Sequence, residues 1–85
     1  MFNVLGFYKF KKLKSLKKNK LFLQKIFTDN DIKGTLIISS EGLNGAISGR
    51  SKNISLISKR IKRLFDIVNF DSENLSKSKF QPFHK

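Results

Sequence analysis

The sequence predicts one small α+β domain with the element order strand, helix, strand, strand, helix, strand. Three observations lead to this prediction. The chain has 85 residues, enough for a single core layer. Two segments repeat apolar residues near the helical period, and the segments around them are alternating or rich in β-branched residues. Finally, GTLIISSEGLNGAISG at 34–49 has the form of two strands joined by a glycine-containing connection.

The first strand and the first helix are predicted from alternation and from helical spacing. The strand covers Asn3–Phe10, where alternation puts Leu5, Phe7 and Lys9 on one face and Val4, Tyr8 and Phe10 on the other. After a basic connection, Ser15 is predicted to cap a helix that ends near Asn30. The apolar positions of this helix are Leu16, Leu23, Ile26 and Phe27.

The next two strands are predicted to form a hairpin. Asn44 and Gly45 are expected to make its turn, because both residue types tolerate positive φ. Gly42 supplies a second permissive position, so residues 39–45 are predicted to bend tightly. Glu41 and Asn44 would then project from the loop.

A second helix and a last strand complete the order. The helix is predicted to be capped by Ser51 or Asn53, and its apolar positions are Ile54, Ile57, Ile61, Leu64 and Phe65. The last strand is expected at Ile67–Phe70. Asp71–Lys79 is expected to be a loop or a fraying edge, and Phe80–Lys85 a proline-interrupted tail.

This element order is the split βαβ, or ferredoxin-like, arrangement. In it, two right-handed crossovers place both helices on one face of a four-stranded antiparallel sheet. We therefore predict a ferredoxin-like domain over residues 1–79, followed by a tail over residues 80–85.

The net charge of +12 is unevenly distributed along the chain. The first acidic residue is Asp29, and eight lysines precede it: Lys9, Lys11, Lys12, Lys14, Lys17, Lys18, Lys20 and Lys25. Clustered cations attract polyanions, and the binding that results weakens with salt. However, fifteen lysines against three arginines also fit a compositional bias, because arginine is the better bidentate phosphate ligand. Charge alone leaves RNA contact and a plain solvated surface equally open.

The composition excludes several kinds of site. The chain has no cysteine, which excludes disulfides, a thiolate nucleophile and cysteine-based metal sites. Its one histidine, His84, is expected to be solvated in the tail. Apolar runs such as Leu36–Ile38 are far too short to span a bilayer, and the N-terminus lacks the order of a signal peptide. We expect a cytoplasmic location, no membrane partner, no metal and no cofactor.

Two motifs resemble a known family. SEGLNGAISG, preceded by GTLII and by FYKF at Phe7–Phe10, resembles the N-terminal domain of the rhodanese-like tRNA uridine hydroxylases. These bacterial enzymes hydroxylate the wobble uridine of tRNA at carbon 5 with molecular oxygen. The similarity runs from about Asn3 to the C-terminus, where Pro82–Lys85 resembles the lead-in to the family's next strand.

The resemblance implies an acylphosphatase-like form of the fold. It also implies a family-motif loop that contains Glu41, Gly42, Asn44 and Gly45. In that family a rhodanese domain carries the reactive cysteine, and the sequence contains no such domain. We therefore expect a non-catalytic domain or fragment that helps to bind tRNA and works with a rhodanese domain in cis or in trans.

The candidate RNA-binding residues are the early lysines, part of the second helix and one aromatic residue. They are Lys9, Lys11, Lys12, Lys14, Lys17, Lys18, Lys20, Lys59, Lys62, Arg63 and Tyr8. The cations would contact phosphates, and Tyr8 would stack on a base if it faces the uncovered side of the sheet. The alternative is that Tyr8 packs in a core or an interface.

Two other functions stay open. The domain could be a protein-interaction module that docks its exposed sheet face on a rhodanese partner. It could also be a small acylphosphatase-like hydrolase, but residues 11–15 contain neither an arginine nor the glycines of an amide cradle. Glu41 has no nearby carboxylate or histidine with which to share acid–base work. No catalytic residue is predicted, and whether this chain is an enzyme stays open.

Overall fold

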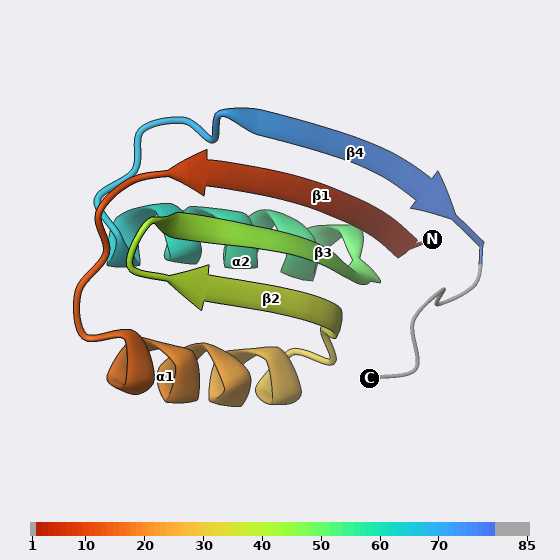
Figure 1. Ribbon diagram of the computed structural model, residues 1–85. Helices are drawn as coiled ribbons and strands as arrows, with labels where there is room; N and C mark the ends of the chain where they lie inside the picture. The colour runs from red at the N-terminus through yellow and green to blue at the C-terminus, as the bar shows by residue number, and fades with distance from the viewer. Residues whose placement is uncertain (1, 80–85) are drawn as a thin grey trace.

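Four antiparallel strands form one sheet, and two helices cover one of its faces, in the computed structural model, which describes residues 2–79 (Figure 1). The elements are β1 (Phe2–Phe10), α1 (Leu16–Asp29), β2 (Lys33–Ser39), β3 (Gly42–Arg50), α2 (Ser51–Leu64) and β4 (Ser72–Ser78). The strand order across the sheet is β2-β3-β1-β4. The predicted βαββαβ order and ferredoxin-like class are confirmed. The predicted tail at 80–85, with His84, lies outside the described residues.

Strand β1 lies in the middle of the sheet and defines its two faces. It pairs with β3 on one side and with β4 on the other, both antiparallel. Leu5 and Phe7 are buried against the helices, whereas Tyr8 and Phe10 are exposed on the opposite face. The division predicted from alternation is confirmed, because successive side chains of a strand point to opposite faces.

The hairpin turn lies at a different place from the one predicted. β2 and β3 are joined by Ser40 and Glu41, and Asn44 and Gly45 lie inside β3, where Asn44 pairs with Ile37. The predicted Asn-Gly turn is therefore wrong. A two-residue connection already reverses the chain, so the Asn-Gly pair is free to continue the strand.

The two glycines of the motif allow close packing instead of a turn. Gly42 has a φ of 154°, and a Cβ there would lie 2.1 Å from the carbonyl oxygen of Lys9. A Cβ on Gly45 would lie 2.7 Å from Cζ of Phe7, on the neighbouring strand. Both positions need a residue without a side chain, because real Cβ atoms do not approach other atoms so closely.

Neither helix has the side-chain cap that was predicted. Ser15 precedes α1 in the left-handed region, at φ 53°, and its hydroxyl makes no capping hydrogen bond. Arg50 occupies the N-cap position of α2. The Ser51 hydroxyl instead donates to Oδ1 of Asn3, and the Asn53 amide donates to the carbonyl of Asn30. Ser51 and Asn53 lie inside α2 and not at its N-cap, and their side chains join separate elements.

The last strand was assigned to the wrong residues. Residues 67–70 form an irregular connection, in which Ile67 is buried and Phe70 stacks on Phe7 with ring centroids 4.7 Å apart. Strand β4 follows in the segment that was expected to be a loop or an edge. Its side chains are largely exposed, and backbone pairing with β1 holds it at the sheet edge. Charged side chains on such an edge oppose pairing with another chain.

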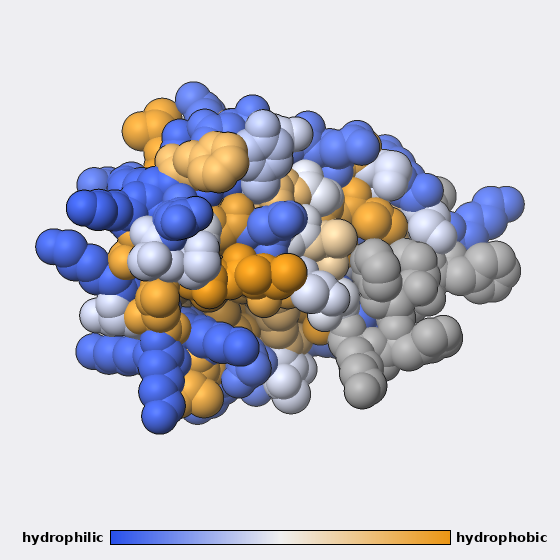
Figure 2. Space-filling model, in the orientation of Figure 1, coloured by the Kyte–Doolittle hydropathy of each residue, from blue (hydrophilic) through white to orange (hydrophobic). Residues whose placement is uncertain are grey.

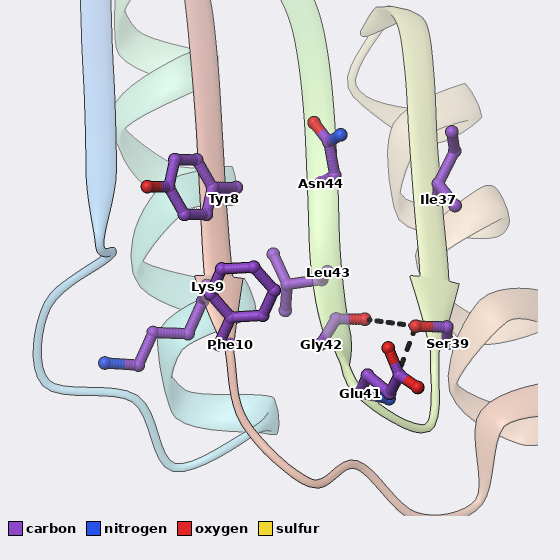
Figure 3. Close-up of a pocket in the computed structure, with 9 residues that line it drawn as sticks. All are labelled: Tyr8, Lys9, Phe10, Ile37, Ser39, Glu41, Gly42, Leu43 and Asn44. Carbon is purple, nitrogen blue, oxygen red and sulfur yellow. Dashed lines mark hydrogen bonds between the residues drawn. The ribbon is translucent and has the colours of Figure 1, made fainter.

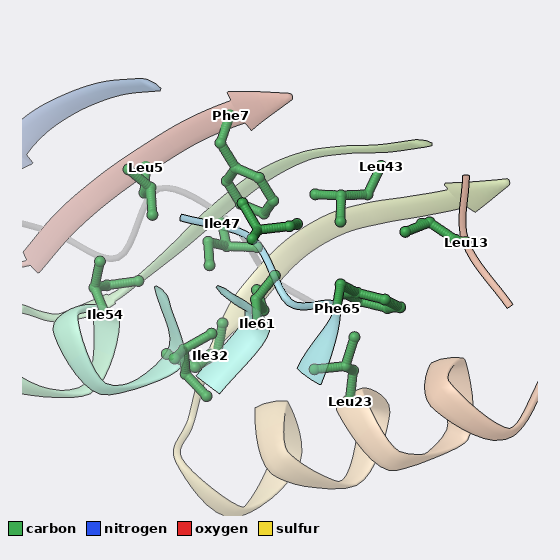
Figure 4. Packing of buried hydrophobic residues seen from close by; sticks show 12 residues of the cluster. Leu5, Phe7, Leu13, Leu23, Ile32, Leu43, Ile47, Ile54, Ile61 and Phe65 are labelled. Carbon is green, nitrogen blue, oxygen red and sulfur yellow. The ribbon is translucent and has the colours of Figure 1, made fainter. Parts of the chain in front are cut away.

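The hydrophobic core lies between the sheet and the helices (Figure 4). Ile54, Ile57 and Ile61 of α2 are all buried, as their spacing predicts. Leu23 is the buried residue of α1, while Leu16, Ile26 and Phe27 pack against the core from its edge. The core therefore uses one face of the sheet, and no helix or strand among residues 2–79 covers the other face.

Candidate nucleic-acid interface

Four lysines that have no side-chain partner within residues 2–79 gather at one end of the molecule. β1 ends there, α1 begins and α2 ends, and hydrophilic side chains extend from this end at the left of the view in Figure 2. Lys12, Lys14 and Lys18 line a hollow of about 310 Å³ beside the end of α2. Lys17 is the first exposed residue of α1 and precedes Lys18 directly. We call Lys12, Lys14, Lys17 and Lys18 the basic corner.

The basic corner is unfavourable for the helix that it begins. Lys17 and Lys18 lie in the first turn of α1, which contains no acidic residue. The N-terminus of a helix carries a partial positive charge, so cations there repel it and an anion would be stabilised. By contrast, Lys62 and Arg63 lie in the last turn of α2, where cations stabilise a helix. The charges of the second pair favour its helix end, and those of the basic corner do not.

Three of the other predicted lysines have partners within the domain. Lys9 forms an ion pair with Asp71 at 3.1 Å. The Lys11 ammonium donates to the backbone carbonyl of Asp66. Lys62 lies 3.9 Å from the Glu73 carboxylate and 4.9 Å from the ring centre of Phe70. These contacts hold the connection between α2 and β4 in place, so the three lysines help to stabilise the fold.

Asp71 is the electrostatic centre of that connection. Its carboxylate accepts hydrogen bonds from the Phe10 backbone amide at 2.7 Å and from the Lys9 ammonium. These two hydrogen bonds, the amide first, hold the pKa of Asp71 below its ordinary value of 3.8. The Asp71 amide in turn donates to the carbonyl of Tyr8. The contacts fix the point where β1 leaves the sheet.

The remaining predicted cations are spread over the helix layer. Lys20 lies beside β2, and Lys59 lies beside β4. Lys59 and Arg63 are exposed on α2. The structure therefore brings together four of the ten predicted cations and distributes the others.

A second feature lies on the open face of the sheet, where Tyr8, Phe10, Ile37 and Asn44 surround a hollow of about 370 Å³ (Figure 3). We call it the open-face hollow. Tyr8 is 41% exposed and Phe10 is 72% exposed, and their rings meet edge to face with centroids 5.6 Å apart. Tyr8 faces the uncovered side, so packing in the core is excluded for it.

The motif residues Glu41 and Asn44 have side chains that the fold does not use. The Glu41 amide donates to the Ser39 hydroxyl, which donates to the carbonyl of Gly42, so the backbone closes the turn. Within residues 2–79, the Glu41 carboxylate and the Asn44 amide make no hydrogen bond or ion pair. Both residues line the open-face hollow.

Phe10 and Ile37 line the open-face hollow, although neither was among the predicted site residues. The alternation of β1 did place Phe10 on the same face as Tyr8, which was the available signal. Ile37 lies between Leu36 and Ile38, and this apolar run hides which of the three is exposed. Its pairing with Asn44 places it on the open face.

The described residues contain no cluster of metal ligands, and two amides after β1 are already hydrogen-bonded. Among residues 2–79, no group of three His, Cys, Asp or Glu side chains could hold a metal ion. In the connection after β1, the amides of Lys11 and Leu13 donate to the carbonyls of Glu41 and Ser40. Those two amides are therefore not free to hold a phosphate. Neither of the two helices is long and apolar enough to cross a membrane.

Known proteins similar to this chain agree with the resemblance in its motifs. Residues 2–85 match the family model described as UPF0176 acylphosphatase-like domain. The whole chain is 55% identical to the tRNA uridine(34) hydroxylase of Pelagibacter ubique (strain HTCC1062), of which it covers 28%. It is 39% identical over 56 residues, 66% of its length, to the tRNA uridine(34) hydroxylase of Acaryochloris marina (strain MBIC 11017), of which it covers 18%. The chain thus spans less than a third of the curated relatives that it matches, and the match is to their N-terminal domain.

Proposed function

The chain belongs to the family of UPF0176 acylphosphatase-like domains, and we propose that it helps to hold tRNA while a catalytic domain hydroxylates the wobble uridine. The relatives that it matches are named tRNA uridine(34) hydroxylases, which supports tRNA as the ligand. Such a substrate fits a cytoplasmic location. The observation that carries the proposal is the basic corner, whose cations have no partner within residues 2–79 and lie at an unfavourable helix end.

In this proposal the chain supplies binding and the reactive group comes from elsewhere. None of its 85 residues is a cysteine, so the thiol of the resembled enzymes must belong to a rhodanese domain in cis or in trans. The chain's own contribution is to neutralise phosphates and to orient the tRNA. Each neutralised phosphate releases counterions, so binding should depend steeply on salt.

Lys20, Lys59 and Arg63 extend the phosphate-binding surface along the two helices. Lys9, Lys11 and Lys62 contribute less, because each already has an acceptor in the domain. An exposed pair of this kind is weak and can exchange with a phosphate. We therefore expect the basic corner to dominate.

The test is to replace Lys12, Lys14, Lys17 and Lys18 together by Gln and to measure tRNA binding between 50 and 200 mM salt. The slope of log affinity against log salt should flatten by up to about 3, because each lost phosphate contact removes about 0.7–0.9 from it. The matched control replaces Lys25, Lys33, Lys52 and Lys77 by Gln. It removes the same charge elsewhere and should change the slope by less than half as much.

Equal slopes for the two variants would count against the basic corner and indicate a diffuse effect of net charge. If the unmodified chain bound tRNA without salt dependence, the proposed function itself would be wrong. A circular dichroism spectrum of each variant verifies that it is folded, which is expected because all eight lysines are at the surface or partly exposed.

A further inference from the structure

The open-face hollow lies across the three strands β1, β3 and β2. In one row across these strands, Tyr8, Asn44 and Ile37 are direct neighbours on β1, β3 and β2. Since adjacent strands lie about 4.8 Å apart, the backbones that carry Tyr8 and Ile37 are separated by roughly 9.6 Å. The short Asn44 side chain lies between them. In this row the Tyr8 ring extends from β1 toward β4, the polar Asn44 side chain lies in the middle, and Ile37 lies on the other side of it (Figure 3).

Small residues border this row on both sides. On one side Gly42 pairs with Phe10, and on the other side Gly6 pairs with Ala46. Gly42 has no side chain to fill the space beside the Phe10 ring. The hollow thus remains open toward solvent.

The chemistry of the hollow matches a nucleobase. Tyr8 and Phe10 offer exposed ring surfaces for stacking, and Ile37 offers an apolar wall. The Asn44 amide has both donors and an acceptor, and it makes no hydrogen bond within residues 2–79. An amide of this kind can pair with the edge of an unstacked base, as in the recognition of single-stranded RNA.

The charge around the hollow favours RNA over a protein partner. The basic connection begins immediately after Phe10, so a strand of RNA with a base on the sheet would have its phosphates near cations. Glu41 is the acidic residue among those that line the hollow. Charge complementarity with a polyanion is therefore strong along this edge.

We propose that the open-face hollow binds one unstacked base of single-stranded RNA, stacked on Tyr8 and hydrogen-bonded to the Asn44 amide. This inference rests on the proposed function and adds to it a site of base contact separate from the phosphate contacts of the basic corner. It makes the domain selective for unpaired RNA over duplex RNA.

The direct test uses the fact that Tyr8 is the only tyrosine of the chain, which has no tryptophan. In the full chain labelled with ring-¹³C tyrosine, Tyr8 gives a single set of ring signals in an NMR spectrum. Hexauridylate should shift these signals upfield at low salt, because a stacked base shields the ring. Inorganic tripolyphosphate, which offers phosphates without bases, should leave them in place.

Matched variants measure the contribution of each group. Tyr8→Ala should weaken hexauridylate binding at least about fivefold, and Tyr8→Phe should retain it within about twofold, because stacking needs the ring and not the hydroxyl. Asn44→Ala should weaken it about fivefold through the loss of one hydrogen bond. Leu56→Ala is the control: Leu56 is 47% exposed on α2, outside the hollow, and its loss should leave binding unchanged.

The outcomes separate the inference from the proposed function. If hexauridylate binds and the Tyr8 signals do not move, or if Tyr8→Ala binds as well as the unmodified chain, the base site is wrong and the phosphate-binding function stands. The open face would then be a surface for protein docking. If neither tRNA nor hexauridylate binds at low salt, the proposed function is wrong as well.

Discussion

The two faces of the sheet are made by the same strands and differ in almost every other respect. On the helix-covered face, Leu5 and Phe7 are each 3% exposed and Ile47 is fully buried. On the open face, Tyr8 and Phe10 follow those buried positions along β1 and keep much of their surface in water. Packing explains each residue of the first face. It does not explain why the second face should display aromatic rings.

That difference separates residues that maintain the fold from residues that are free to act. Exposing large apolar side chains close together increases the tendency to associate, so such groups commonly mark a binding surface. The polar residues show the same contrast. Asn3 and Asn53 make hydrogen bonds that join elements, whereas Asn44 makes none within residues 2–79. Functional residues are therefore sought among those that the fold does not need.

Removing one aromatic ring from each face should have very different effects on stability. Phe7→Ala should lower the free energy of unfolding by about 3–5 kcal/mol, because it leaves a cavity and removes the stacking partner of Phe70. That is a large part of the stability of a small domain. Tyr8→Ala should cost less than about 1 kcal/mol. Urea unfolding followed by circular dichroism measures both, and similar losses would contradict the division of the sheet into two roles.

The fold was predictable where burial imposes a period. The isoleucines of α2 and the alternating residues of β1 are spaced so that one face of each element is buried. That spacing therefore predicted the type and the orientation of both elements. Strand β4 carries no such signal. Its side chains are exposed, and it exists because its backbone pairs with β1, which any sequence can do. The apolar residues Ile67 and Phe70 were instead mistaken for a strand, although they fill the core from an irregular connection.

The candidate site was predictable only in part. The density of lysines early in the chain was visible, but which of them have acceptors depends on residues about 55–62 positions away. Asn44 was assigned to a turn because Asn-Gly has strong turn propensity. The turn is made instead by Ser40 and Glu41, and only the register between β2 and β3 shows that Asn44 faces the open side. Long-range pairing was the missing information in both cases.

Replacing Asp71 tests the contacts that stabilise the end of β1, where residues of the two faces meet. Its carboxylate holds Lys9, on the helix side, and the Phe10 amide, next to the open face. Asp71→Asn should lower the melting temperature at neutral pH, by much less than Phe7→Ala, because the pair is partly exposed. The pKa of Asp71 is lowered in the folded state, so its stabilisation is present above the ordinary value of 3.8 and is lost as the pH falls through the lower native value.

The melting temperatures of the unmodified chain and the Asp71→Asn variant should therefore converge in acid. Asp29→Asn is the matched control, since its carboxylate is exposed on α1 and makes no ion pair within residues 2–79. The melting temperature of the Asp29→Asn variant should differ little from that of the unmodified chain at every pH. A constant gap for Asp71→Asn down to strong acid would show that the carboxylate charge is not what stabilises this connection.

Glu41→Gln should change stability very little, and the removal of its charge predicts the direction of its effect on RNA binding. It is exposed at the hairpin turn and lines the open-face hollow, and its carboxylate has no partner within residues 2–79. Glu41→Gln should leave the free energy of unfolding within about 0.5 kcal/mol, because the backbone amide that closes the turn is kept. It should tighten hexauridylate binding about twofold at low salt, since one repulsive charge near the phosphates is removed. The gain should disappear at high salt, where the charge is screened.

Asp29→Asn removes the same charge from α1, outside the hollow, and should give a smaller gain in hexauridylate binding. If Glu41→Gln weakened binding, the carboxylate would be a direct ligand, and the RNA would lie on the open face in a different way from the one proposed.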